Sequence, residues 1–376
     1  MLQFLGECLE GVWGPFRLLK SHSFLIAFGS LGSLAVVLAF LPRLWRFLPL
    51  DRGKPLAADG GKQSAGKPTG AGLLFSLLSL PVAVLAMPMS VKDAGVLVCL
   101  FFVMLFGYLD DRSETPWGRT QKGLLDAAVS AAAAIFVYSS VATADGAEVW
   151  WPFFKETTAV PWWVYIPGAT ALLWISINAT NCSDGVDGLA GSLVLISLIF
   201  LALFLYVVAG NAIVAKYLLV PASPVAPRWA ILMMSIAGAL GGYLWYNADP
   251  SRVLMGDAGS RFLGLAVGIG VLVAGNPFLL LVFAPVILMN GGGGLFKIML
   301  LKFFRRLGMD VAPPGAAGAN HGGRPLLPRL LHHYRFPLHD HCRHKLGWSK
   351  GQVLMRFMLL QAFLMPLIFV LFVKIR

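Results

Sequence analysis

The chain has 376 residues, of which 57% are hydrophobic and only 13% are charged, and its formal net charge is +12. Soluble proteins carry about 25% charged residues, and a soluble core of this composition would leave too much apolar surface in water. The composition therefore excludes a soluble enzyme, a disordered chain and a disulfide-stapled secreted protein, and it predicts a polytopic membrane protein. The scattered cysteines form no CxxC pair and indicate no redox or zinc-ribbon framework.

The chain begins with an amphipathic stretch, residues 1–20, which we expect to be interfacial and not a cleaved signal peptide. Ten apolar segments follow, each with the length and composition of a membrane-spanning helix. Their apolar runs are continuous, whereas barrel strands would alternate in polarity. The predicted fold is all-α with about ten transmembrane helices, at residues 22–43, 70–87, 91–109, 123–141, 161–177, 189–209, 229–246, 261–274, 277–300 and 353–373.

Basic residues concentrate in the loop between the first two predicted spans and in residues 301–352, between the ninth and tenth. Such loops are retained on the cytoplasmic side, so both termini are predicted to lie outside. The positive net charge is then explained by membrane orientation and by binding to anionic lipid head groups and a phosphorylated substrate, and we predict no nucleic acid partner. We expect one integral membrane domain over residues 1–376, with a flexible insertion rich in Pro, Gly and Ala at 311–328.

The polar motifs all fall in odd-numbered loops of this map. They are residues 66–69, Asp110-Asp111 with Lys122, residues 178–188, Asn247 with residues 255–260, and residues 339–341. Odd loops share one side of the membrane, and the even loops hold nothing comparable. The pattern predicts a single polar site at the cytoplasmic face.

Asp110 and Asp111 stand at the end of the third span. Two adjacent carboxylates repel unless a cation or a shared proton intervenes, and Mg²⁺ binds through one or two carboxylates plus substrate phosphates. A helix boundary exposed to water is the alternative explanation of this pair. Asp257, in the sequence Met-Gly-Asp-Ala-Gly-Ser, could equally cap the eighth span. Beside other acidic loops on the same face, we interpret Asp257 as a metal ligand.

The segment 178–188 carries Asn181, Asp184 and Asp187 at intervals of three, with Gly185 and Gly188 between them. The glycines favour an irregular loop in which the backbone approaches a ligand closely, although Asn, Asp and Gly also form ordinary turns. The segment lies between two apolar spans and contains no Lys or Arg. Uncompensated acid in such a place is unfavourable unless it binds something, so we favour a functional role.

Six of the seven histidines fall in the last loop. A zinc site is conceivable at His339, His341 and His344, but no CxxC or HExxH spacing supports one. Beside nearby arginines and lysines, a cationic surface for phosphate oxygens is the preferred interpretation. A solvated basic loop remains credible for His321, His332 and His333. Acidic loops for a cation beside basic groups for phosphate predict phosphoryl transfer from a soluble donor to a lipid acceptor.

These motifs make the chain resemble the polyprenyl-phosphate N-acetylhexosamine-1-phosphate transferases, and within them the phospho-N-acetylmuramoyl-pentapeptide-transferase family. The resemblance covers essentially the whole chain. It is carried by residues 106–111 (FGYLDD), 120–124 (TQKGL), 178–190 (NATNCSDGVDGLA), 255–260 (MGDAGS), and 337–341 (PLHDH) with 346–348 (LGW).

The resemblance implies that UDP-N-acetylmuramoyl-pentapeptide and undecaprenyl phosphate give lipid I and UMP in peptidoglycan biosynthesis, with Mg²⁺. It implies that Asp257 holds Mg²⁺ with Asn181, and that Asp110 and Asp111 act near the lipid phosphate, Asp110 as the candidate for removing its proton. It further implies a homodimer in the bacterial plasma membrane, and a ninth helix broken at the glycine run 291–294. The implied substrate-binding residues are Lys122 and the His339–His341 motif for phosphates, Asp184 for the pyrophosphate and metal region, Asp187 for uracil, and Asn178 and Asn181 in the same segment.

The chain departs from the family pattern at several positions. Asp340 replaces the middle of three histidines, Asn290 stands where a Glu is usual, and Leu254 replaces an aromatic residue before Met-Gly-Asp. Lys62 is the candidate for a lysine expected near Ser64, and residues 308–334 resemble an insertion. The altered histidine motif leaves a sister transferase that uses another UDP-sugar as an alternative, and a transporter ranks last because no repeat is found.

Overall fold

The structure is a computed structural model that describes residues 1–53, 64–115, 117–152, 154–309 and 333–374. The predictions about Lys62, His321, His332 and most of the insertion fall outside the described residues. The described elements in chain order are α1 (Leu2–Leu9), a 3₁₀ helix (Gly14–Lys20), α2 (His22–Leu44), a 3₁₀ turn (Trp45–Phe47), α3 (Ala71–Ala86), α4 (Val91–Arg112), α5 (Arg119–Val141), β1 (Ala142–Thr143), β2 (Gly146–Val149), β3 (Thr158–Val160), α6 (Trp162–Ser183), α7 (Leu189–Leu203) with a π-helical extension (Phe204–Ala209), α8 (Ala212–Tyr217), α9 (Ala226–Asn247), α10 (Gly256–Val273), α11 (Leu279–Phe283), α12 (Pro285–Ile287), a π-helical turn (Leu288–Gly292), α13 (Gly293–Arg306), α15 (Leu338–Lys345) and α16 (Lys350–Lys374).

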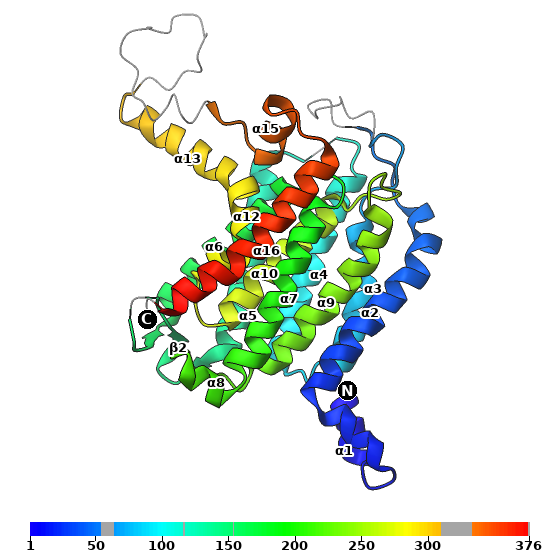
Figure 1. Cartoon of the computed structure of the whole chain (residues 1–376), viewed down its shortest axis with the longest axis vertical. Coiled ribbons are helices and arrows are strands. Elements are labelled where there is room, and N and C mark those ends of the chain that lie inside the picture. Colours follow the sequence, from blue (N-terminus) through cyan, green and yellow to red (C-terminus); the bar gives the residue numbers. More distant parts are fainter. Residues whose placement is uncertain (54–63, 116, 153, 310–332, 375–376) are drawn as a thin grey trace, which may run out of the picture.

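Each of the ten predicted spans coincides with helix, so the all-α membrane fold is confirmed (Figure 1). Within the described residues, eight helices are long and apolar enough to cross a membrane. The span predicted at 70–87 forms α3, whose 16 residues make it a shorter apolar helix. The N-terminal stretch folds into short helical pieces, with large apolar side chains such as Phe4 and Trp13 exposed, and its interfacial placement stays a prediction.

Helix α10 forms the centre of the bundle. Every residue from Ala258 to Val273 is buried, and the helix packs against α3, α4, α6 and α7. Small residues permit this packing: a Cβ added to Gly107 of α4 would lie 2.6 Å from Cα of Ala258. The backbone of α4 therefore passes directly beside the start of α10, which brings the end of α4 to the same place.

The two ends of the bundle differ in chemistry. At the end near α15, which we call the site end, loops far apart in sequence join: Leu254 N–H donates to the Pro68 carbonyl (2.8 Å) and Arg52 donates to the Glu114 carbonyl (2.7 Å). At the opposite end, the sheet end, Trp150 N–H donates to the Gly275 carbonyl (2.9 Å). Figure 1 shows β2, α8 and both termini away from α15. The prediction that the polar motifs share one face is confirmed.

The loop after the fourth predicted span contains structure that the sequence pattern did not indicate. Its three short strands form a small antiparallel sheet in the order β1-β2-β3. The buried Trp150 that follows β2 donates its indole N–H to the Ala274 carbonyl (2.9 Å). This bond ties the sheet to the turn after α10.

The ninth predicted span is broken, but not where the glycine run predicted the break. The helix is interrupted at Ala284 (φ −133°, ψ 40°), because Pro285 lacks an N–H and disfavours helical geometry in the residue before it. The glycine run instead contributes to the π-helical turn and continues directly into α13. The break leaves backbone groups without helical partners, and the Gln361 side chain of α16 bonds two of them. Its Oε1 accepts from Val286 N–H and its Nε2 donates to the Phe283 carbonyl (both 3.0 Å). Beyond the turn, α13 leans out of the bundle and buries none of its residues (Figure 1).

Candidate active site

The candidate site lies where the end of α4, the start of α5, the end of α6 and the start of α10 meet. Two helix boundaries differ from prediction. Helix α6 continues to Ser183, so Asn178 and Asn181 stand on a helix and not in a loop. Helix α10 begins at Gly256, so Asp257 belongs to its first turn. Both helices continue past the apolar residues because tertiary contacts at the site stabilise their polar ends.

Asp111 supplies the N-terminal cap of α10. Its carboxylate accepts hydrogen bonds from the backbone N–H groups of Asp257 (2.9 Å) and Ala258 (3.1 Å). A carboxylate at this position satisfies donors that a helix leaves unpaired and complements the positive end of the helix dipole. The alternative considered for Asp257, an N-terminal cap, is therefore wrong: Asp111 supplies the cap, and Asp257 is left to face the site.

Asp110 is held from two sides. Its Oδ1 accepts a hydrogen bond from Trp117 N–H (2.8 Å), and its Oδ2 forms an ion pair with the Lys122 ammonium. The side chain is 6% exposed, whereas that of Lys122 is 25% exposed. The alternative that Asp110 is a helix end freely exposed to water is therefore wrong.

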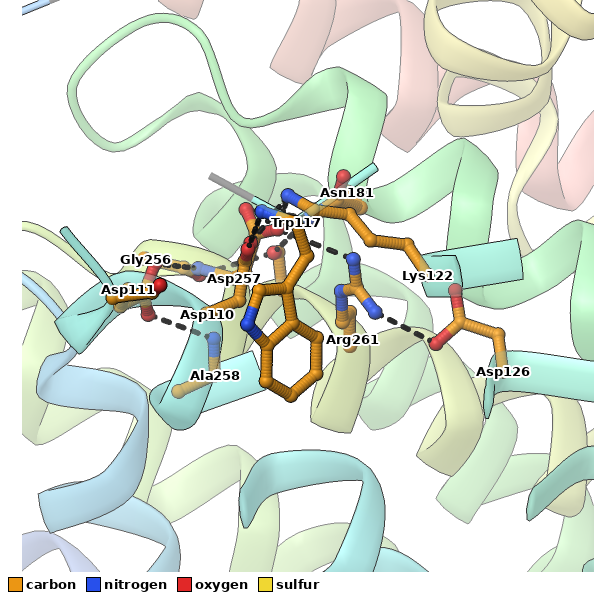
Figure 2. Close-up of polar contacts among 12 residues, drawn as sticks. Asp110, Asp111, Trp117, Lys122, Asp126, Asn181, Gly256, Asp257, Ala258 and Arg261 are labelled. Carbon is orange, nitrogen blue, oxygen red and sulfur yellow. Dashed lines mark hydrogen bonds and ion pairs between the residues drawn. The ribbon is translucent and has the colours of Figure 1, made fainter. Parts of the chain in front are cut away.

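Asp257 lies at the centre of the polar cluster (Figure 2). One carboxylate oxygen, Oδ2, contacts Lys122 Nζ (3.1 Å) and Arg261 Nη2 (3.2 Å). The other, Oδ1, accepts from Asn181 Nδ2 (3.1 Å), and Asn181 also donates to Ser260 Oγ (2.9 Å). The structure thus brings together five of the predicted residues: Asp110, Asp111, Lys122, Asn181 and Asp257.

Two charged residues in this cluster were missed by the sequence reasoning. Arg261 Nη1 donates to Asp126 Oδ1 (2.9 Å), and both side chains are 3% exposed. Asn178 reaches the cluster through Asp126, at 3.5 Å, and also donates to the Trp174 carbonyl (2.9 Å). A signal was available: Asp126 follows Lys122, and Arg261 follows Asp257, by four residues, which places each pair on one helix face inside an apolar segment.

The oxygen-rich chemistry of the cluster fits magnesium. Asp257 and Asn181 carry carboxylate and amide oxygens, the hard ligands that Mg²⁺ takes, and the Asn181 amide, whose Nδ2 now donates to Asp257, would present its oxygen to a metal ion after a flip. Within the part of the chain that the structure describes, no group of three or more His, Cys, Asp or Glu side chains is arranged as a metal site. Mg²⁺ characteristically keeps waters and substrate phosphates among its ligands, so one or two protein carboxylates match its requirements.

The loop after α6 is irregular, as its glycines predicted. Asp184 follows the helix with non-helical geometry (φ −84°, ψ 72°), and Gly188 adopts a positive φ of 76° while its N–H donates to Asn247 Oδ1 (2.7 Å). Asp187 forms an ion pair with Lys350 Nζ (3.3 Å) at the start of α16. This ion pair joins the loop to the last helix and was not predicted.

His339 is a buried, neutral residue and not part of a cationic surface. It is 2% exposed, and both its N–H and its Nδ1 contact Asn290 Oδ1 (2.9 and 3.1 Å). Burial lowers its pKa to about 4, against the raising effect of Asp340, and Arg343 lowers it further. A Cβ added to Gly185 would lie 2.2 Å from Nε2 of His339, so the imidazole ring packs directly on the loop after α6.

His341 is also held within the protein. Its Nδ1 accepts a hydrogen bond from Arg335 N–H (3.2 Å), and its ring contacts Tyr334. Burial lowers its pKa, and the nearby Lys345 and His333 lower it further. Burial and neighbouring cations therefore favour the neutral forms of both imidazoles, so the positive charge predicted for this surface belongs to its arginines and lysines, and phosphate binding by His339 and His341 stays a prediction.

Comparison with known proteins gives consistent similarities. The family model for glycosyl transferase family 4 matches residues 94–275, which include the whole cluster around Asp257. Two proteins of Treponema pallidum, from two different strains, are each 43% identical over 359 residues, covering 95% of this chain and 92% of the relative. A protein of Gemmatimonas aurantiaca is 30% identical over 381 residues, covering 95% of both chains. All three are named phospho-N-acetylmuramoyl-pentapeptide-transferase.

Proposed function

The chain belongs to the phospho-N-acetylmuramoyl-pentapeptide-transferase family, and from this premise we propose which atoms and residues carry out its reaction. It is a phosphoglycosyl transferase and a multi-pass bacterial membrane protein. Phospho-N-acetylmuramoyl-pentapeptide passes from UDP-N-acetylmuramoyl-pentapeptide to undecaprenyl phosphate, giving lipid I and UMP. The names of the relatives do not favour a sister transferase for another UDP-sugar.

The observation that carries the mechanism is the sharing of Lys122 between Asp110 and Asp257. Its side chain is 25% exposed, against 6% for Asp110 and 17% for Asp257, so an incoming phosphate oxygen can reach it. Phosphoryl transfer needs little covalent chemistry from a protein, and positioned opposite charges supply most of the acceleration. Lys122 is suited to neutralise charge on the donor pyrophosphate.

Asp110 is suited to take the proton of the lipid phosphate. Its Oδ1 is fixed by Trp117 N–H and its Oδ2 by Lys122, so the carboxylate is oriented before the acceptor arrives. Once Lys122 turns to the donor, Oδ2 becomes available as a general base. Asp111 does not take part in this step, because both of its oxygens cap α10 and keep Asp257 in place.

Magnesium, held by Asp257 with Asn181, would supply positive charge to the pyrophosphate oxygens. The loop after α6 provides the donor contacts that the resemblance assigns to Asp184 and Asp187. Buried His339 and His341 act as neutral hydrogen-bonding groups near this loop. We also propose that the site end faces the cytoplasm, supported by the basic residues in its loops, and that the protein forms a homodimer.

Purified protein in lipid nanodiscs, supplied with UDP-N-acetylmuramoyl-pentapeptide, undecaprenyl phosphate and Mg²⁺, is expected to release UMP. Omission of either substrate or addition of a chelator should stop the release. No UMP from the complete mixture would reject the proposed reaction. Release that UDP-N-acetylglucosamine supports as well as the muramoyl donor would move the activity to the sister transferases.

A further inference from the structure

Arg261 occupies a position where a charge is unfavourable. It lies in α10, is 2% exposed, and is surrounded by residues that are also buried. Its guanidinium bridges two carboxylates, Asp126 on α5 (2.9 Å) and Asp257 on its own helix (3.2 Å), as Figure 2 shows. An ionisable residue inside a membrane-spanning segment calls for an explanation beyond packing.

Stability alone does not explain this residue. Its Nε has no hydrogen-bond partner among the described residues, so the buried guanidinium is incompletely satisfied. Buried ion pairs are often no more stabilising than apolar side chains of similar volume. The geometry therefore relates Arg261 to the group that it contacts at the centre of the cluster, the Asp257 carboxylate.

The two cations on Asp257 Oδ2 are held very differently. Lys122 is partly exposed and divides its contacts between Asp110 and Asp257. Arg261 is enclosed and tethered through a second nitrogen to Asp126. Two cations within about 3.2 Å of one oxygen repel each other, and this repulsion is relieved when the mobile one moves to another anion.

We propose that Arg261 is a positioning residue: it is the fixed counter-charge of Asp257, anchored by Asp126, and it frees Lys122 to move to a phosphate oxygen of the donor. The movement of Lys122 rests on the proposed function. The electrostatic part does not, because it concerns only the charges around Asp257. The ion pairs join three carboxylates (Asp110, Asp126, Asp257) to two cations (Lys122, Arg261), and Asp111 adds a further carboxyl group beside them, so acidic groups are in excess.

This charge balance predicts opposite effects for the two halves of the pair. Arg261→Leu makes the net charge of these groups more negative by one unit, and Asp126→Asn makes it less negative by one unit. A unit charge within several ångströms of a divalent cation changes the affinity of the site for that cation by about tenfold. Arg261→Leu should therefore bind Mn²⁺ more tightly than the wild type, and Asp126→Asn more weakly. The double variant Asp126→Asn/Arg261→Leu has the original balance and should regain wild-type affinity.

The experiment measures Mn²⁺ binding to the purified full-length protein in nanodiscs, without donor or acceptor, by the loss of the free-ion electron paramagnetic resonance signal. Arg228→Leu is the matched control. Arg228 also pairs with a buried carboxylate, Asp93 (3.3 Å), but at the sheet end. That variant should lose thermal stability and keep wild-type Mn²⁺ affinity.

Turnover separates positioning from a merely structural role. Arg261→Leu is expected to lower kcat by about 100-fold, because small displacements of a catalytic group are costly, while KM for the donor stays within about threefold. Arg261→Lys keeps the charge but cannot reach both carboxylates with a planar fork, so it should show wild-type Mn²⁺ affinity and only partly restored kcat.

Opposite shifts of Mn²⁺ affinity in the two single variants, cancelled in the double variant, support the inference. Shifts in the same direction, unchanged affinities, or no Mn²⁺ binding by the wild type would overturn it. If the wild type shows the expected pattern but releases no UMP, the proposed reaction fails while the electrostatic role of Arg261 stands. If UMP is released but the affinities do not shift, only the inference about Arg261 fails.

Discussion

Two aspartates, one at each end of the bundle, each have an arginine partner but differ in burial and in their other contacts. At the sheet end, the Asp93 side chain is fully buried and accepts hydrogen bonds from Ser90 N–H (2.9 Å), Ser90 Oγ (2.8 Å) and Ser140 Oγ (2.8 Å), besides Arg228. At the site end, Asp257 is 17% exposed and contacts two cations and one amide.

The comparison shows how a structural carboxylate differs from one prepared for chemistry. Asp93 caps the start of α4 in a capping box, and its single charge is met by one arginine and neutral donors. Around Asp257 the carboxylates outnumber the cations, and one of those cations is accessible. Charge imbalance with access for a ligand, and not burial alone, marks the site end as functional.

The largest effect is expected from Asp257→Asn. The variant removes the anionic oxygen that would hold a metal ion, and it should lower kcat by about 1,000-fold. The measurement is UMP release per folded enzyme. The matched variant Asp93→Asn should instead destabilise the fold by about 3 kcal/mol, because it breaks a buried ion pair, and leave kcat unchanged.

This pair of variants can break the comparison. Wild-type turnover in Asp257→Asn would contradict the metal assignment. A loss of turnover in folded Asp93→Asn equal to that in Asp257→Asn would show that the two ends are functionally coupled, and the division into a structural and a catalytic aspartate would be wrong.

Asp110→Asn should have the next largest effect, about 100-fold on kcat near pH 5, where the lipid phosphate still holds its second proton, if its carboxylate removes that proton. The defect should be partly relieved as pH rises, because a phosphate monoester loses its second proton near pH 6 without help. The measurement is a pH profile of UMP release. A defect that does not change with pH would assign Asp110 a positional role.

Asp111→Asn is the control for that profile. Asp111 caps α10 through two backbone N–H groups, so its loss should lower stability by about 1 kcal/mol, and any loss of kcat should not depend on pH in the manner of a general base. A relief at high pH equal to that of Asp110→Asn would show that the two carboxylates share the proton.

The sequence was sufficient for the parts of this molecule that follow from hydropathy and loop order. Continuous apolar runs predicted all ten helical segments, and the odd-numbered loops predicted that the polar motifs meet at one end. The ends of α6 and α10 were misjudged because hydropathy stops at the first polar residues, whereas helical hydrogen bonding continues through Asn181 and back to Gly256.

The missed features depend on contacts between segments distant in the chain. Asp126 and Arg261 are 135 residues apart, and nothing in either apolar segment indicates that they meet. The neutral state of His339 depends on enclosure by α15, the loop after α6 and Asn290, which composition cannot predict. The sheet over residues 142–160 likewise depends on its contact with the turn after α10.

A third prediction extends the comparison to a pair of intermediate exposure, Asp187 and Lys350, whose side chains are 12% and 18% exposed. Lys350→Met leaves the carboxylate unpaired and loosens the loop after α6 from α16. Because this loop is proposed to bind the donor in both the ground and transition states, KM for the donor should rise about tenfold with kcat little changed. Steady-state UMP release at varied donor concentration measures both constants, and an unchanged KM would remove Asp187 from the donor site.

The last prediction concerns the pH dependence of stability at His339. The pKa of His339 in the folded protein is about 4, below the ordinary value of 6.5. Between these values the unfolded chain binds more protons than the folded one, so the stabilisation by neutral His339 is present above pH 6.5 and is lost as pH falls toward 4. The full difference between the two pKa values corresponds to about 3 kcal/mol in the free energy of unfolding.

His339→Gln should therefore flatten the fall in thermal unfolding temperature between pH 6.5 and 4, although it lowers stability at neutral pH by removing the contacts with Asn290. His344→Gln, an exposed change on the same helix, should retain the wild-type slope. Stability lost in acid at His339 arises because a buried imidazole must take up a proton. Stability lost in acid around Asp257 arises because its carboxylates are protonated. The two contributions are separable, because only the second should also weaken Mn²⁺ binding. A wild-type slope in His339→Gln would place the acid sensitivity of the site end entirely in its carboxylates.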